Sequence, residues 1–206
     1  MSKEREKDSP ATRRGARNRA AILSAARELI LEQGVDAVSL RQIAARADYS
    51  PAALYEYFPS KEALVAELAQ VAGDRFRRAL EMAKGKTPLE RLERLADAYR
   101  TWAVTNPDDY LLAFGRLPSK RTKSSQPVEG SAFGIVQRAV EEALAAGALQ
   151  PVPGLGAHEL TYGLWALVHG QVMLQLTHLS GFETDFSSMD RALVQRFLAG
   201  LARRDS

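Results

Sequence analysis

The sequence predicts an all-α protein of about nine helices, divided into a short N-terminal group and a longer C-terminal group. Along most of its 206 residues, apolar side chains recur every three or four positions, which is the spacing of one helix face. Ser, Thr, Asp or Asn precedes nearly every such stretch, as expected of an N-cap. No segment shows the alternation typical of a strand. We therefore expect an N-terminal three-helix bundle followed by a larger helical domain.

The N-terminal group carries clear helix boundaries. Gly34 is suited to the C-terminal end of the first helix. Ser39 and Gln42 form a capping box, and Asp48 occupies a turn where a positive φ is often needed. Pro51 at the first position of the next helix has no N–H to leave unpaired. The predicted helices cover, approximately, residues 18–33, 39–47, 50–58 and 60–83.

The C-terminal group repeats this pattern with longer helices. Thr87 is followed by Pro88 and Glu90, a second capping box with proline at its first helical position. Residues 118–130 contain prolines, serines and lysines, and are predicted to form an exposed loop. A Pro/Gly-rich linker is expected at 151–156. The predicted helices lie near residues 88–102, 107–114, 131–147, 157–180 and 187–203.

Composition narrows the functional class. Cysteine is absent, which excludes disulfides, thiolate catalysis and cysteine metal sites. The first ten residues lack the apolar stretch of a signal peptide, and no apolar stretch reaches the length of a membrane span. We therefore expect a soluble cytoplasmic protein, nucleoid-associated if it binds DNA. Arg13, Arg14, Arg17 and Arg19 follow one another with no acid among them, so residues 1–16 are predicted to form a disordered basic arm. Such an arm is either a solvated tail or, if a DNA-reading motif follows it, a basic arm beside that motif.

Residues 39–58 have the geometry of a helix-turn-helix, in which the second helix enters a major groove of DNA. The side chains at spacings that would fix the two helices against the first are Leu40, Ile43, Ala44, Ala47, Leu54 and Phe58. A short helix pair can also be only a packing motif. The small residues that open the second helix, however, allow close approach to DNA, and its N-terminal end favours phosphate.

The stretch from Ile22 to Leu64, which includes S-L-R-Q-I-A-A-R-A-D-Y-S-P-A-A-L-Y-E-Y-F-P-S-K-E-A-L, closely resembles the N-terminal domain of TetR-family regulators. The resemblance implies a DNA-binding domain at residues 17–64, a dimer, and a helical ligand-binding and dimerisation domain at 65–206. It implies base-edge contacts from Arg41, Pro51, Ala52, Ala53 and Glu56. It implies phosphate contacts from Ser39, Ser50, Tyr55, Tyr57 and Lys61.

This sequence departs from the family pattern at three positions. Asp48 stands where Gly is usual, although Asp tolerates a positive φ better than most residues. Ala53 replaces a common Thr, which removes one polar contact. Glu56 is an acid on a DNA-facing helix, where it can accept from a cytosine amino group or repel phosphate at wrong sites. We favour the first role.

The C-terminal region is similar to a TetR subfamily with a Trp-His-Gly signature, here Trp165, His169 and Gly170. Trp165 and His169 share a helix face. One interpretation makes them core residues, with His169 hydrogen-bonded in the interior. The other places them on the wall of an apolar effector pocket with few polar groups. The pocket candidates are Tyr99, Trp102, Tyr110, Phe114, Phe133, Trp165, His169 and Met173.

The helix predicted at 157–180 is apolar nearly all round, so it must be covered on every side. The last helix can cover only part of it, and pairing with a second copy of the chain would complete the burial. The candidates for this homodimer interface are Val168, Val172, Leu176, Leu179, Leu193, Phe197 and Leu201. A two-fold dimer presents two recognition helices, so the operator should be near-palindromic.

Other functional classes have little support. His158, His169 and His178 show no zinc-type spacing, and no nucleophile elbow or phosphate-binding loop is present. We expect no enzyme activity, no cofactor and no metal. The remaining alternative is an architectural DNA-binding protein without ligand control, which would not need a long aromatic-rich C-terminal domain. The sequence thus predicts a repressor released from double-stranded DNA by an unidentified small-molecule effector.

Overall fold

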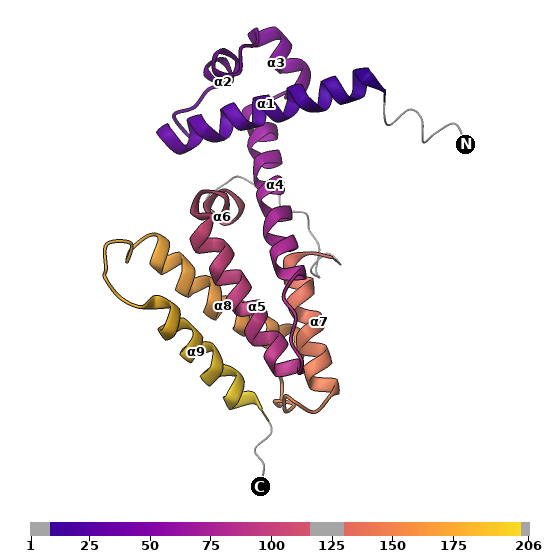
Figure 1. Ribbon diagram of the computed structural model, residues 1–206, viewed down its shortest axis with the longest axis vertical. Coiled ribbons are helices and arrows are strands. Elements are labelled where there is room, and N and C mark those ends of the chain that lie inside the picture. Colours follow the sequence, from indigo (N-terminus) through magenta and orange to yellow (C-terminus); the bar gives the residue numbers. More distant parts are fainter. Residues whose placement is uncertain (1–8, 116–129, 203–206) are drawn as a thin grey trace, which may run out of the picture. The chain divides into compact units, whose positions relative to one another are not determined.

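A computed structural model describes residues 9–115 and 130–202, and these residues form an all-α fold (Figure 1). Its helices are α1 Pro10–Gln33, α2 Leu40–Arg46, α3 Pro51–Tyr57, α4 Lys61–Glu81, α5 Pro88–Thr105, α6 Pro107–Phe114, α7 Ala132–Ala145, α8 Ala157–Leu176 and α9 Phe186–Leu201. Extended pairing within the described ranges is limited to isolated bridges near the C-terminal turns. The predicted fold class is confirmed.

The predicted caps define where several helices begin. Ser39 and Ser50 each accept a hydrogen bond from the backbone N–H three residues ahead, and Ser39 forms the complete capping box. Thr87 and Ser131 do the same for α5 and α7. Caps of this kind contribute about 1 kcal/mol each. Asp48 has φ 61°, as its place in the turn predicted.

The start of α1 corrects one prediction. The helix begins at Pro10, not near residue 18, because Ser9 caps it by accepting from the N–H of Thr12 at 3.2 Å. Residues 10–16 of the predicted disordered arm are therefore helical, while residues 1–8 lie outside the described residues. Most of the loop expected at 118–130 also lies outside them. At the other end of the chain, α8 stops at Leu176 rather than near residue 180.

The described chain separates into two compact units, which divide within α4 after Val71. The first unit holds α1–α3, the first half of α4 and residues 112–115; the second holds the rest. The sequence placed this boundary at residue 64, where the motif ends. A helix that continues through a boundary gives no local sign of where it changes its packing partners.

The core of the first unit fixes α2 and α3 against α1 and α4. Ile22, Ile43, Leu54 and Leu64 are fully buried, and Phe58 is 1% exposed. Burial of such side chains contributes roughly 1.5–3 kcal/mol each. Of the six side chains predicted to hold the two short helices, all are buried except the half-buried Ala47.

The second unit is built around α5, which packs against α7, α8 and α9. Leu92, Leu95, Val140, Leu164 and Val172 are among its most deeply buried side chains. In Figure 1 the helices can be followed in chain order by their colours, from indigo at α1 to yellow at α9. Within the ranges that the structure describes, none of the helices has both the length and the hydropathy needed to cross a membrane.

Candidate nucleic-acid interface and effector pocket

The turn between α2 and α3 is closed by backbone hydrogen bonds. The N–H of Tyr49 donates to the carbonyl of Ala44 at 2.8 Å, which the positive φ of Asp48 makes possible. Leu54 and Phe58 then anchor α3 in the core. Because those two positions point inward, the opposite face of α3 is presented outward.

The structure places most of the predicted base-edge residues on that outward face. Pro51, Ala52 and Glu56 are exposed on α3, and Arg41 is exposed on α2. Ala53 is half-buried. The small side chains at the start of α3 leave its backbone accessible, which is what close approach to a groove requires.

Three of the residues predicted to contact phosphate, Tyr55, Ser39 and Ser50, lie near this face. Tyr55 is 54% exposed. It lines a shallow groove with Ser39, Arg41 and Lys61. The hydroxyl oxygens of Ser39 and Ser50 accept from the backbone N–H groups of Gln42 and Ala53, at 3.3 and 3.1 Å. Both serines therefore hold the helix starts, and the contacts expected of them with phosphate remain predictions.

Lys61 already has partners within the first unit, and the phosphate contact expected of it remains a prediction. Its ammonium donates to the carbonyls of Val35 and Val38 at 2.9 Å and to that of Asp36 at 3.3 Å. An ammonium has three donors, and all three are engaged with the loop between α1 and α2. Sequence spacing could not show this because the loop lies more than twenty residues away along the chain.

Tyr57 and Arg19 join the end of α3 to its neighbours. The amide of Asn18 donates to the Tyr57 hydroxyl at 3.0 Å, so this oxygen is already an acceptor within the unit. Arg19 donates to the Tyr57 carbonyl at 2.9 Å and forms a bidentate ion pair with Glu67. Its guanidinium also lies 4.3 Å from the centre of the Phe58 ring. Arg19, predicted as part of a basic run, is thus a connection between α1, α3 and α4.

Arg46, one of the two arginines of α2, also has partners within the first unit. Arg46 forms ion pairs with Glu32 at 2.8 Å and with Glu28 at 3.6 Å, both on α1. Hydrogen bonding to Arg46 lowers the pKa of the Glu32 carboxyl. Of the basic residues between 39 and 61, Arg41 is therefore the one with no such engagement among the described residues.

The second unit contains a polar cluster that the sequence predicted only as separate candidates. The hydroxyls of Tyr99 and Tyr110 lie 2.7 and 2.8 Å from Nδ1 of His169, and 3.0 Å from each other. Burial raises the pKa of Tyr110 to about 12 and that of Tyr99 further. Burial also lowers the pKa of His169. The three groups are therefore neutral near pH 7.

Aromatic rings surround this cluster. Trp165 packs edge-on against Tyr99 with ring centres 5.1 Å apart, and Phe133 lies 5.6 Å from Trp165. Phe76 on α4 lies 4.8 Å from Tyr99 and 5.1 Å from Trp102. Phe76 was not among the predicted pocket residues; it joins this group of rings from α4.

A small, mainly apolar hollow adjoins the cluster, with Tyr99 and Trp165 in its wall. Trp165 and His169 are only half-buried. The hydrogen bonds of His169 agree with the interpretation that it is an interior histidine. The adjoining hollow agrees with the other interpretation, in which Trp165 lies on the wall of a pocket. Of the other candidates, Phe114 belongs to the first unit, and Met173 is half-buried one turn beyond His169.

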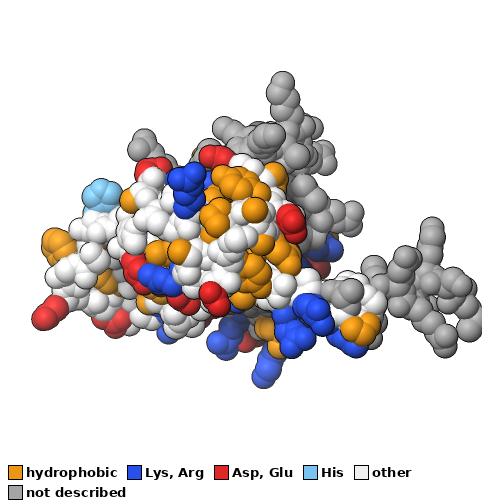
Figure 2. All heavy atoms as spheres, turned by 90° about the horizontal axis from the view of Figure 1, so that it is seen from above, with side chains coloured by type: hydrophobic (Ala, Val, Ile, Leu, Met, Phe, Trp, Pro, Cys, Tyr) orange, Lys and Arg blue, Asp and Glu red, His pale blue; other side chains and the backbone are white. Residues whose placement is uncertain are grey.

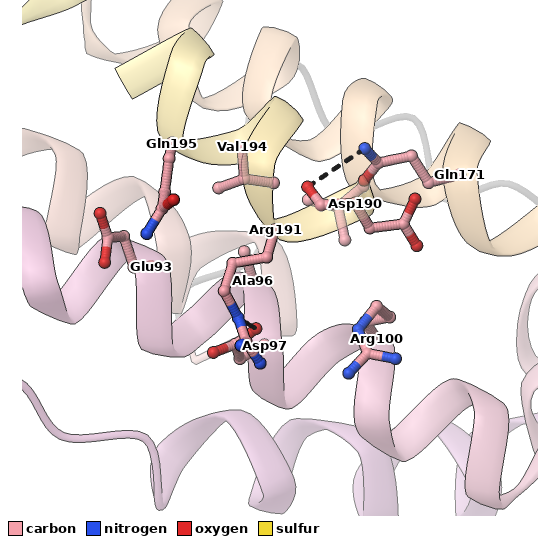
Figure 3. Close-up of a pocket in the computed structure, with 10 residues that line it drawn as sticks. Glu93, Ala96, Asp97, Arg100, Gln171, Asp190, Arg191, Val194 and Gln195 are labelled. Atoms are coloured by element: carbon pink, nitrogen blue, oxygen red, sulfur yellow. Dashed lines mark hydrogen bonds and ion pairs between the residues drawn. The ribbon is translucent and has the colours of Figure 1, made fainter. Parts of the chain in front are cut away.

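Another small hollow lies between α5, α8 and α9, and most of the side chains that line it are polar (Figure 3). Asp190 is 4% exposed there. Its Oδ2 and the Nε of Arg100 are buried without a hydrogen-bond partner among the described atoms. Burial raises the pKa of Asp190, and the charge of Arg100 opposes this rise. No pattern in the sequence indicated this site, since both residues occupy positions that fit a polar helix face.

Two residues of the predicted dimer face are buried within the chain itself. Val168 is 3% exposed and Val172 is fully buried, so the chain's own core already covers them. Leu176, Leu179, Phe197 and Leu201 are half-buried, and Leu193 is 47% exposed. The large apolar side chains left exposed on α8 and α9 are Tyr162, Leu174, Met189 and Leu193.

Comparison with known families gives two matches on this chain. The model described as "Bacterial regulatory proteins, tetR family" matches residues 22–68. The model described as "Tetracyclin repressor-like, C-terminal domain" matches residues 92–201. The finer resemblance to the Trp-His-Gly subfamily stays a prediction.

Individual relatives agree with these matches. The chain is 28% identical over 187 residues to the uncharacterized HTH-type transcriptional regulator YobS of Bacillus subtilis (strain 168), covering 87% of this chain and 90% of that protein. A solved structure of a protein of unknown function from Rhodococcus sp. RHA1 is 30% identical, with TM-score 0.74 and coverage of 90% and 96%. A TetR family transcription regulator from Marinobacter aquaeolei VT8 shares the fold at 23% identity, with TM-score 0.70 and coverage of 93% and 99%.

Proposed function

Because the chain belongs to the TetR family and is a DNA-binding transcriptional regulator, we propose that it is a ligand-controlled repressor. It binds a near-palindromic operator as a homodimer and leaves it when a small molecule binds the second unit. The observation that carries ligand control is the Tyr99–Tyr110–His169 cluster beside a mainly apolar hollow. An architectural DNA-binding protein has no need of such a site.

Recognition of the operator is assigned to the outward face of α3. Arg41 and Glu56 supply the hydrogen-bonding groups that can distinguish base edges, since an arginine favours guanine and a carboxylate accepts from cytosine. Pro51, Ala52 and Ala53 shape the approach, and Tyr55 donates to phosphate. The exposure of α3 opposite its buried Leu54 supports this assignment.

Pairing of two chains is assigned to the apolar side chains exposed on α8 and α9. Tyr162 and Leu174 lie towards opposite ends of α8, within about a third of its circumference. Met189 and Leu193 are one turn apart on α9. Leu176, Leu179, Phe197 and Leu201 would extend the same interface. A two-fold axis through it gives the two copies of α3 that a palindromic operator requires.

We expect the effector of the second unit to be a mostly apolar, ring-containing molecule with one or two hydrogen-bonding groups. The rings of Trp165, Phe133 and Phe76 suit an apolar body. The neutral hydroxyl and imidazole groups of the cluster suit a neutral polar group rather than a charge, because an unpaired buried charge is unfavourable. Such a ligand releases DNA only if it favours the non-DNA-binding conformation, with a coupling of about 1–3 kcal/mol.

The experiment starts with DNA selected by the purified protein from a random pool of duplexes. Affinity for the selected duplex is then measured while a library of small aromatic compounds is added. We expect at least one compound to weaken binding by about tenfold or more. We expect Trp165→Ala with His169→Ala to keep DNA affinity but to lose the response, while His178→Gln, on an exposed histidine, keeps both.

Two outcomes would contradict parts of this proposal. If the Trp165 and His169 variant responds as the wild type does, the cavity assignment is wrong. If no compound changes the affinity for the selected duplex, the architectural alternative is favoured.

Glu56→Gln is expected to change which duplex sequences are selected, because it alters a base-edge group and not a phosphate contact.

A further inference from the structure

Packing does not explain why the first two turns of α1 are helical. Residues 10–17 contain no apolar side chain larger than proline, and none of their described side chains is buried. A Cβ on Gly15 would meet nothing within 4 Å. The first fully buried side chain of α1 is Ile22, further along the helix. Residues 10–17 therefore form a helical extension of about 12 Å. It continues α1 beyond the part of that helix that packs in the core, and Ser9 caps it.

The extension is strongly basic on one side. Arg13, Arg14 and Arg17 are exposed, and at 100° per residue their positions fall within an arc of about 100°. Residues 9–27 contain no Asp or Glu. Figure 2 shows Lys and Arg side chains gathered on the lower right part of the described surface, towards the N-terminal end of α1.

The base of the extension is fixed beside the recognition helix. Asn18 and Arg19, the next two residues, both bond to Tyr57, which is the last residue of α3. The row of arginines therefore starts where α3 ends, within the same compact unit.

The recognition elements themselves are poor in available cations. Lys61 is engaged with three backbone carbonyls, and Arg46 with two glutamates. Proteins that bind duplex DNA tightly neutralise several phosphates, and each neutralised phosphate adds to the salt dependence of binding. Arg41 alone cannot supply this charge for one subunit.

We propose that the helical extension of α1 is a second DNA-binding surface, on which Arg14 and Arg17 contact backbone phosphates outside the bases read from α3. Arg13 lies on the same face. The surface is sequence-independent, because a guanidinium on phosphate carries no base information. This inference rests on the proposed function, in which α3 lies in the major groove.

The test uses the full-length protein with Arg14→Gln and Arg17→Gln combined. Dissociation constants are measured against the selected duplex and a scrambled duplex of equal length, over a range of salt concentrations. We expect binding to weaken by about tenfold or more on both duplexes. The slope of log K against log salt should become shallower by about 0.9 for each phosphate that the variant no longer neutralises. Thermal unfolding should be unchanged, since both side chains are exposed.

Two matched variants isolate the cause. Arg78→Gln with Arg138→Gln removes the same charge from exposed positions of the second unit, and it should leave affinity and slope unchanged. Arg14→Lys with Arg17→Lys keeps the charge and should restore most of the affinity, since an ammonium also binds phosphate.

An unchanged affinity and slope for Arg14→Gln with Arg17→Gln would overturn the inference. So would a weakening confined to the selected duplex, because that would indicate base recognition. Failure of the proposed function is a separate result: the wild-type protein would then bind the selected and scrambled duplexes equally. The salt slope on the scrambled duplex would still report whether the extension contacts phosphate.

Discussion

Burial sets the protonation of individual residues in the Tyr99–Tyr110–His169 cluster. Tyr99, Tyr110 and His169 converge from three helices, and each has a pKa shifted towards its neutral form by desolvation. A neutral cluster can exchange hydrogen bonds with a neutral ligand at low desolvation penalty. The same residues make the stability of the second unit sensitive to pH.

Removing His169 should reduce that sensitivity. The pKa of His169 is lower in the folded protein than the ordinary histidine value of about 6.5. As the pH falls below that value, the unfolded chain therefore binds a proton at His169 before the folded chain does. Stability is thus fully present above that pH and decreases below it, by at most about 1.4 kcal/mol per pH unit. We expect the urea midpoint of His169→Gln to vary less than that of the wild type between about pH 7.5 and 5. His178→Gln is the control, and equal pH dependence of wild type and His169→Gln would contradict the explanation.

At the scale of secondary-structure elements, basic side chains hold the DNA-binding unit together. Lys61 fastens the loop between α1 and α2 to the start of α4. Arg19 fastens α1 to the end of α3 and to Glu67 on α4. Both connections hold in place the elements that flank α3. The orientation of the recognition helix is thus set by α1 and α4 together.

Lys61→Met should therefore act on stability and not on the salt dependence of binding. Loss of the ammonium leaves three carbonyls without their donor, two of them partly buried, which should lower the free energy of unfolding by about 1 kcal/mol. The slope of log K against log salt should remain that of the wild type. Lys86→Met, at an exposed position of the second unit, should change neither quantity. A flatter slope with unchanged stability would show instead that Lys61 is a phosphate contact.

At the scale of the whole molecule, the exposed apolar side chains of α8 and α9 point to association between two chains. Tyr162 is 66% exposed, and Leu174, Met189 and Leu193 are each close to half exposed. Grouped apolar exposure of this kind marks an interaction surface more often than scattered residues do. Its burial in a dimer would bring two DNA-binding units to one operator.

Leu193→Glu should break this association. A carboxylate placed in an apolar interface loses its hydration without gaining a partner. We expect the variant to sediment as a monomer and to bind the selected duplex at least tenfold more weakly, since binding by one unit is weaker than by two. Met82→Glu, at a 78% exposed position just after α4, should remain like the wild type. A dimeric Leu193→Glu protein would exclude this face as the interface.

Local chemistry was sufficient to determine the secondary structure and the family. The caps at Ser39, Ser50 and Thr87 fix helix starts through contacts only three residues long, so they can be recognised in the sequence. Asp48 adopts the positive φ that its turn requires. The motif around the turn led to the family for the same reason: all of its parts lie within about forty consecutive residues.

Only the tertiary structure decided which of these side chains were available for function. Arg19 and Glu67 are 48 residues apart, and Lys61 reaches carbonyls more than twenty residues away, so no local pattern could reveal that they are engaged. Likewise, periodicity showed that α8 is apolar but not that Val168 and Val172 are covered while Tyr162 and Leu174 are exposed. Spacing along a helix defines its faces, whereas the number of neighbours packed against each face depends on the fold of the whole chain.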